Sequence, residues 1–311
     1  MPRKTDRRPA RPMVRALRED GQTFVFVATI LFGLIVLVST VINVGQAVNR
    51  RVFLQMAADA GAFTGATEMA RGMNTLAERN RRIQRGWATL SRVIGKWYMP
   101  CLISGRATAS FGSGQAAEAR IIDAVNAGYG ARAVSEAGRV THYNIGDLFP
   151  DRYAGQERVT FTEGDAALGV GPQRPRGRVV DLEEVPQGTS PKAAGGPAAN
   201  RRLRYTCLVF RPGPVRVSRT ASVGLWFRKK EGTPPVAFVW VVKAPATGAR
   251  VFDELFGPNL IPEMTAVAAA KPVGGNIEKG EATYVTKMIP VRDLLGGVMD
   301  TWNQRWRTLT H

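Results

Sequence analysis

A long apolar run near the N-terminus constrains this chain more than any other feature. Residues 24–44 read FVFVATILFGLIVLVSTVINV, and residues 22–49 carry no charged side chain. At about 1.5 Å of rise per residue, a helix over this run spans roughly 30 Å, the thickness of the hydrocarbon core of a bilayer. The sequence therefore predicts one transmembrane helix within residues 21–47, and its anchoring side chains are Phe24, Val27, Leu31, Leu34, Val38, Val41 and Val44.

The flanks of the apolar run predict its orientation. Residues 1–20 carry seven cations, whereas the twenty residues after the run carry two, Arg50 and Arg51. Because an excess of Lys and Arg marks the cytoplasmic side, residues 1–20 are expected as a cytoplasmic tail and the chain after residue 48 as extracytoplasmic. The apolar core of a signal peptide is shorter, about 7–15 residues. We therefore expect a retained anchor, with cleavage at residues 45–47 as the alternative.

After the anchor, the sequence predicts a long amphipathic helix over residues 48–98, since residues 50–97 contain no proline. Apolar side chains recur at spacings of four and three from Met69 to Trp97, with Asn80 as a polar interruption. Such a seam is typical of a coiled-coil-like association, in which Asn80 sets the register, or of a helix packed on the chain's own C-terminal domain. Interior glycines weaken an autonomous coil, which favours the second interpretation.

Two stripes of small residues precede this seam. They recur every four residues and comprise Ala57, Gly61 and Gly65 in one stripe and Ala58, Ala62 and Ala66 in the other. Small side chains let helix backbones approach closely. We expect these six residues to mediate association with neighbouring helices, and an Ala-rich helix without a partner is the competing interpretation.

Charge suggests a second kind of partner. The chain has 43 Lys and Arg against 25 Asp and Glu, a net charge of +18. An exported domain meets acidic polymers, lipid phosphates or acidic proteins, so we predict no specific nucleic acid. The candidate contacts are Arg79, Arg81, Arg82 and Arg85 on the long helix. The simpler interpretation is that these arginines form a solvated helix face.

Three short elements occur in a fixed order around the apolar run. Gly21-Gln22-Thr23 opens it, Asn43-Val44-Gly45-Gln46 closes it, and LQMAADAGAFTGA follows at residues 54–66. This combination resembles the N-terminal signature of the Tad (Flp) pilus-assembly TadE/TadG-like family, over about residues 15–70. The resemblance implies a single-span pseudopilin-like or accessory protein of a type IV-related pilus or adhesion system in the bacterial inner membrane. It implies other pilus-assembly or pilin-like proteins, or further copies of the chain, as partners.

The chain departs from the family pattern at two positions. Asn43 stands where the family usually has Asp, and Phe26 stands where prepilin-peptidase substrates have Glu, five residues after the glycine. Whether the chain is processed after Gly21 is therefore left open. Longer TadG-like proteins carry a D-x-S-x-S metal motif, which this sequence lacks, so no metal site is predicted.

The C-terminal two thirds predict an α+β domain over residues 99–311. A helix is expected at residues 116–127, and β-rich runs occur at residues 202–210, 215–227, 235–243, 264–270 and 282–289. These runs predict an antiparallel sheet with flanking helices. The Gly- and Pro-rich stretch 169–200 predicts a flexible connector.

The two cysteines, Cys101 and Cys207, bound the chemistry of this domain. Disulfides persist in oxidising compartments, so a bridge is expected outside the cytoplasm, with two buried thiols as the alternative. The chain has two histidines and no P-loop, G-x-S-x-G or H-E-x-x-H motif. We therefore expect neither an enzyme nor a cofactor. The alternative to a pilus role is a membrane-tethered protein whose basic helix captures acidic polymers.

Overall fold

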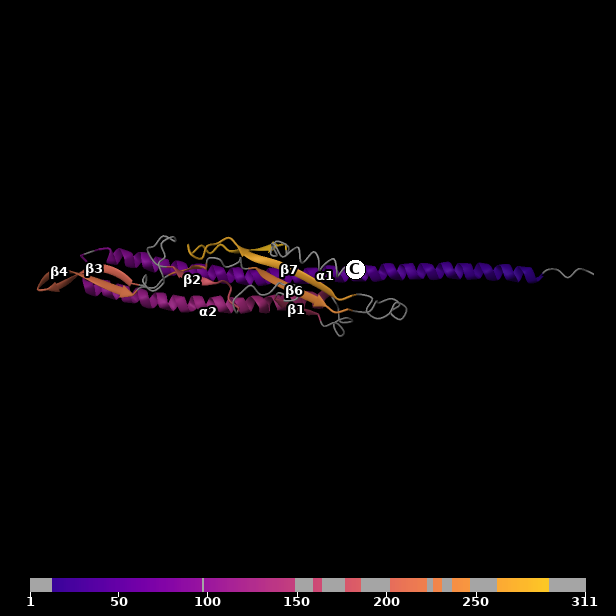
Figure 1. Cartoon of the computed structure of the whole chain (residues 1–311), viewed down its shortest axis with the longest axis horizontal. Helices are drawn as coiled ribbons and strands as arrows, with labels where there is room; N and C mark the ends of the chain where they lie inside the picture. Colours follow the sequence, from indigo (N-terminus) through magenta and orange to yellow (C-terminus); the bar gives the residue numbers. More distant parts are fainter. Residues whose placement is uncertain are drawn as a thin grey trace, which may run out of the picture. The chain divides into compact units, whose positions relative to one another are not determined.

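The computed structural model describes residues 13–96, 98–148, 159–163, 177–185, 202–222, 226–230, 237–246 and 262–290. Two helices precede the strands along the chain, α1 (Met13–Ile94) and α2 (Cys101–Leu148). The strands are β1 (Thr160–Glu163), β2 (Leu182–Val185), β3 (Arg202–Arg211), β4 (Gly213–Ser222), β5 (Trp226–Lys229), β6 (Phe238–Ala244), β7 (Met264–Val273) and β8 (Val285–Ile289) (Figure 1). This order, with antiparallel pairing throughout, confirms the predicted α+β class.

The chain divides into two compact units. The N-terminal unit comprises Met1–Val52 and Pro245–Glu263, and the main unit comprises Phe53–Ala244 and Met264–His311. The sequence predicted a boundary near residue 98, between the long helix and the domain. Instead, the part of α1 that begins at Phe53 belongs to the same unit as α2 and the strands.

Helix α2 runs antiparallel to α1 in the main unit. Arg79 on α1 forms an ion pair with Glu118 on α2 at 3.3 Å, and Glu68 lies 4.0 Å from Arg132. The residue nearer the start of α1, Glu68, thus contacts the residue further along α2, Arg132, as expected for antiparallel helices. The helix predicted at residues 116–127 is therefore only the middle of a helix of 48 residues.

A four-stranded sheet packs against this helix pair in the order β1-β6-β7-β8. Its central strand β6 is buried almost throughout, and Phe238 and Trp240 are 0% and 1% exposed. The Trp240 indole donates a hydrogen bond of 2.8 Å to the hydroxyl of Thr141 on α2. Because the indole N–H is satisfied, this large side chain fills the core without a polar penalty.

Two further pairs of strands stand apart from this sheet, β2-β5 and β3-β4. The run predicted as one strand over residues 215–227 is split between them, since β4 ends at Ser222 and β5 begins at Trp226. The other four predicted strands are confirmed, as β3, β6, β7 and β8.

Buried or half-buried asparagines on the two helices hold the strands and loops by their backbones. The Asn80 side chain donates to the carbonyls of Phe227 and Ile277 and accepts from the Phe227 N–H, at 2.7–2.9 Å. Asn74 bonds both backbone groups of Tyr284 in the same way. An amide offers a donor and an acceptor side by side, as a neighbouring strand does. Asn80 therefore serves the chain's own domain, as the favoured interpretation of the seam required.

Part of the stretch predicted to be flexible is built into this core. Within residues 169–200 the structure describes residues 177–185, and Val179 and Val180 are at most 1% exposed. Asn126 on α2 accepts hydrogen bonds from both of their N–H groups and donates to the Val180 carbonyl. The high Gly and Pro content of the stretch predicted a flexible connector, although Val179 and Val180 within it are buried and bonded to Asn126.

Candidate functional site

The first candidate site is the apolar surface of α1 in the N-terminal unit. All seven predicted anchor residues are exposed there, from 45% at Val38 to 75% at Phe24. A window of this helix has a mean hydropathy of 2.8, and 6% of it is buried. The hydroxyls of Thr29, Ser39 and Thr40 donate to carbonyls four residues earlier, so their polar groups are satisfied within the helix. The segment is long and apolar enough to cross a membrane.

One side of the same helix is polar and buried within the N-terminal unit. Ser39, Asn43 and Arg50 are 3–5% exposed and recur at spacings of four and seven, which places them on one face. The Arg50 guanidinium donates a hydrogen bond of 2.6 Å to the Pro245 carbonyl. No motif in the sequence links these three residues. Their spacing was the signal that could have identified this face.

The small-residue stripes lie in the main unit, against the chain's own sheet. Ala57, Ala58, Ala62 and Ala66 are fully buried. A Cβ atom on Gly61 would lie 2.5 Å from Trp240 Cδ1, and a Cβ atom on Gly65 would overlap the Phe238 ring. The structure thus gives the stripes partners within the chain, namely strand β6 and, at Gly61, also Thr141 of helix α2.

This packing predicts what a larger side chain does at Gly65. We expect Gly65→Leu to lower the free energy of unfolding by about 3 kcal/mol, because overpacking of a dense core forces side chains and backbone to shift. Thermal unfolding of the purified protein in detergent measures the change. Gly33→Leu, at a helix position with nothing within 4 Å of an added Cβ, is the matched control and should leave the stability unchanged. Equal stability of the two variants would contradict this packing.

The four candidate polyanion contacts are not equally available. Arg79 forms its ion pair with Glu118, and Arg82 forms one with Glu78 at 3.0 Å. Arg81 and Arg85 are exposed. A hollow of about 490 Å³ between α1 and α2 is lined mainly by Ile83, Gly86, Leu90, Val93, Ala107 and Phe111, with Arg82 and Glu118 among its polar side chains.

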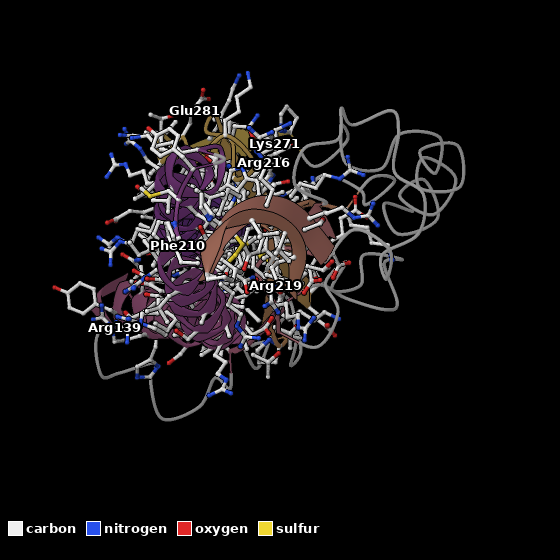
Figure 2. The ribbon with its side chains drawn as sticks, turned by 90° about the vertical axis from the view of Figure 1, so that its left-hand side faces the viewer. Arg139, Phe210, Arg216, Arg219, Lys271 and Glu281 are labelled. Atoms are coloured by element: carbon white, nitrogen blue, oxygen red, sulfur yellow. A yellow bond between two sulfur atoms is a disulfide. The ribbon has the colours of Figure 1, made fainter. Side chains whose placement is uncertain are left out.

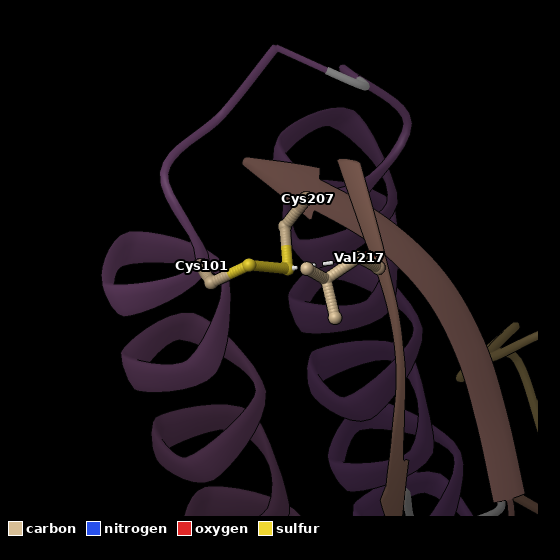
Figure 3. The surroundings of a disulfide bond; sticks show 3 residues. All are labelled: Cys101, Cys207 and Val217. Atoms are coloured by element: carbon tan, nitrogen blue, oxygen red, sulfur yellow. Dashed lines mark hydrogen bonds between the residues drawn. A yellow bond between two sulfur atoms is a disulfide. The ribbon is translucent and has the colours of Figure 1, made fainter. Parts of the chain in front are cut away.

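Cys101 and Cys207 form a disulfide with an S–S distance of 2.07 Å (Figure 3). Cys101 is the first residue of α2, and Cys207 lies in the middle of β3, where its side chain is fully buried. The bridge therefore fixes β3 to the start of the second helix. Next to the disulfide, Pro100 and Leu208 form an isolated parallel β-bridge through their backbones.

Titratable groups do not gather into a reactive centre in the part of the chain that the structure describes. There, no three His, Cys, Asp or Glu side chains are grouped as a metal site would need. Burial is the main cause that raises the pKa of the Tyr284 phenol, and the Glu281 carboxylate adds to the rise.

Comparison with known proteins identifies the N-terminal segment. Residues 21–68 match the Tad family model, described as Flp pilus-assembly TadE/G-like. The match covers the apolar surface and the small-residue stripes, and it confirms the resemblance seen in the sequence. No curated protein and no solved structure matches the chain. The similarity to this family thus extends over residues 21–68, and the apolar helix within them indicates membrane anchoring.

Proposed function

We propose that this protein is a membrane-anchored, pseudopilin-like or accessory component of a Tad (Flp, type IV-related) pilus assembly or adhesion system. The family match over residues 21–68 carries the proposal, because it coincides with the exposed apolar part of α1. The role is association and requires no catalytic step or cofactor. Its partners are other pilus-assembly or pilin-like proteins, or further copies of the chain.

The proposed location is the bacterial inner membrane, with the N-terminus in the cytoplasm and the main unit in the periplasm. The seven cations of residues 1–20 support this orientation. The Cys101–Cys207 disulfide supports it independently, because such bonds persist in oxidising compartments and are rare in the cytoplasm. Fusions of alkaline phosphatase to either terminus test the orientation, and activity of the N-terminal fusion alone would contradict it.

Burial of the small-residue stripes supports a narrower surface for the proposed association. The small-residue stripes are covered by β6, so the proposed contacts are the apolar side chains of α1 in the N-terminal unit. Helices in lipid associate through close van der Waals packing and hydrogen bonds rather than through the hydrophobic effect. The alternative function, capture of acidic polymers by a basic helix, has less support because Arg79 and Arg82 are paired within the chain.

The anchor predicts the result of placing charge in the apolar run. We expect Leu31→Arg with Leu34→Arg to release the protein from membranes, since each Arg at the centre of a helix costs about 2.5–3.5 kcal/mol of insertion free energy. Carbonate extraction followed by fractionation measures the release. Leu102→Arg, at a residue of α2 that is 65% exposed, is the control and should leave the protein in the membrane pellet.

The pilus role is tested in the source bacterium. Deletion of the gene should abolish sheared surface pili or surface adhesion, and the wild-type gene should restore them. The double arginine variant should fail to restore them even when it is exported and folded. Normal pili and normal adhesion in the deletion strain would reject the proposed function.

A further inference from the structure

The hairpin formed by β3 and β4, hereafter the basic hairpin, carries charge of one sign. Residues 202–222 contain five arginines and no Asp or Glu. Figure 1 places the hairpin at the end of the main unit where α1 ends and α2 begins. Figure 2 shows Phe210, Arg216 and Arg219 at this end of the unit.

One face of the basic hairpin is open to solvent. Residues directly opposite each other share a face of an antiparallel pair, and the register places Arg204 opposite Thr220 and Phe210 opposite Pro214. The side chains of this face are exposed at Arg204, Thr206, Phe210, Pro214, Arg216, Ser218 and Thr220. The opposite face contains Cys207, which is fully buried.

The basic hairpin is held firmly although it belongs to neither larger sheet. The disulfide ties β3 to α2, and the Leu208 N–H donates a hydrogen bond of 2.9 Å to the Met99 carbonyl. Arg204 and Tyr205 line a hollow of about 430 Å³ with the last turn of α1. A surface that is already ordered loses little conformational entropy when it binds a partner.

The outer edge of β4 has strand-pairing capacity. Among the described residues, β4 is paired with one strand only, β3, along its ten residues. An edge strand offers N–H and C=O groups to a further extended chain. The positive charge beside this edge repels a second copy of the hairpin and attracts an acidic strand.

We propose that the basic hairpin binds an acidic, extended segment of another protein, which adds along the edge of β4. Charge complementarity selects the acidic side chains, and the β4 backbone selects a peptide over other polyanions. Phe210 is 65% exposed on the open face, which also carries Arg204, and protein interfaces are enriched in aromatic residues and Arg. The proposal rests on the hairpin alone and does not depend on the pilus role.

Two peptides of equal charge test the mode of binding. The probes are fluorescent ten-residue repeats of Glu-Thr and of Glu-Pro, titrated with the full-length protein in detergent micelles at low salt. We expect the Glu-Thr peptide to bind at least about tenfold more tightly, because proline lacks the N–H that strand pairing requires. Equal affinity for the two peptides would overturn the proposal.

Matched arginine variants locate the site. Arg204→Gln, Arg211→Gln and Arg219→Gln, at three exposed arginines of the hairpin, together should raise the Kd of the Glu-Thr peptide about tenfold, since each exposed ionic contact contributes modestly. The control combines Arg120→Gln, Arg132→Gln and Arg139→Gln, three exposed arginines on α2, and should leave the Kd within about twofold. Equal losses in both variants would overturn the proposal. Tighter binding of an anionic polysaccharide or of phosphatidylglycerol vesicles, lost in the hairpin variant, would also overturn it.

Discussion

Asn80→Ala is expected to lower the free energy of unfolding of the main unit by about 3 kcal/mol, since each buried polar group left without a partner costs about 1–3 kcal/mol. The side chain is fully buried and satisfies backbone groups of Phe227 and Ile277, which lie in different segments of the chain. Alanine removes both the donor and the acceptor, so the Phe227 N–H and the Phe227 and Ile277 carbonyls lose their partner in the core. Urea unfolding in detergent, followed by tryptophan fluorescence, measures the loss.

The control for this variant is Asn144→Ala. The Asn144 amide is half-buried and donates only to the Val140 carbonyl of its own helix. Helix formation satisfies that carbonyl in any case, so we expect a change below about 1 kcal/mol. Equal losses at the two positions would mean that Asn80 does not hold the strands.

Removal of the disulfide is expected to destabilise the protein by about 4–5 kcal/mol in the chain-entropy model, because the bond closes a loop of about a hundred residues. The two cysteines are 106 positions apart in the sequence. The variant is Cys101→Ser with Cys207→Ser, and its urea midpoint is compared with that of the oxidised wild type. The slope of the transition should be steeper for the variant, because its unfolded chain lacks the closed loop and exposes more surface.

Reduction provides the matched control for this second prediction. A reductant should lower the stability of the wild type towards that of the double serine variant and leave the variant itself unaffected. The wild type should also migrate faster on a non-reducing gel, since the closed loop is more compact when denatured. A wild type that is no more stable than the variant would show that the bridge contributes nothing to folding.

The sequence was sufficient for the elements whose signal is local. The apolar run, the helix seam and four of the predicted strands each depend on the spacing of residues within one segment. Asn80 could be singled out as a polar member of the seam, and its burial follows from that position. Its partners could not be named, because they lie about 150 to 200 residues further along the chain.

The predictions that differ most from the structure are those that depend on glycines. Gly128 and Gly130 directly follow the helix predicted at residues 116–127, yet α2 continues through them to Leu148. A Cβ atom on Gly130 would overlap the Gly177 carbonyl, so this glycine permits close approach of another backbone. Gly61 and Gly65 likewise permit close approach, in their case of the Trp240 and Phe238 rings. Gly61, Gly65 and Gly130 each have a close neighbour, and the sequence alone does not identify that neighbour.

The burial of Gly61 and Gly65 under β6 also has a consequence for timing during synthesis. The stripe leaves the ribosome well before the residues that cover it, Phe238 and Trp240. At about 5–20 residues per second, some 180 residues of chain take roughly 10–35 seconds to make. During that interval the small-residue stripe of the nascent helix is uncovered, and it can be covered only after Phe238 and Trp240 have been synthesised.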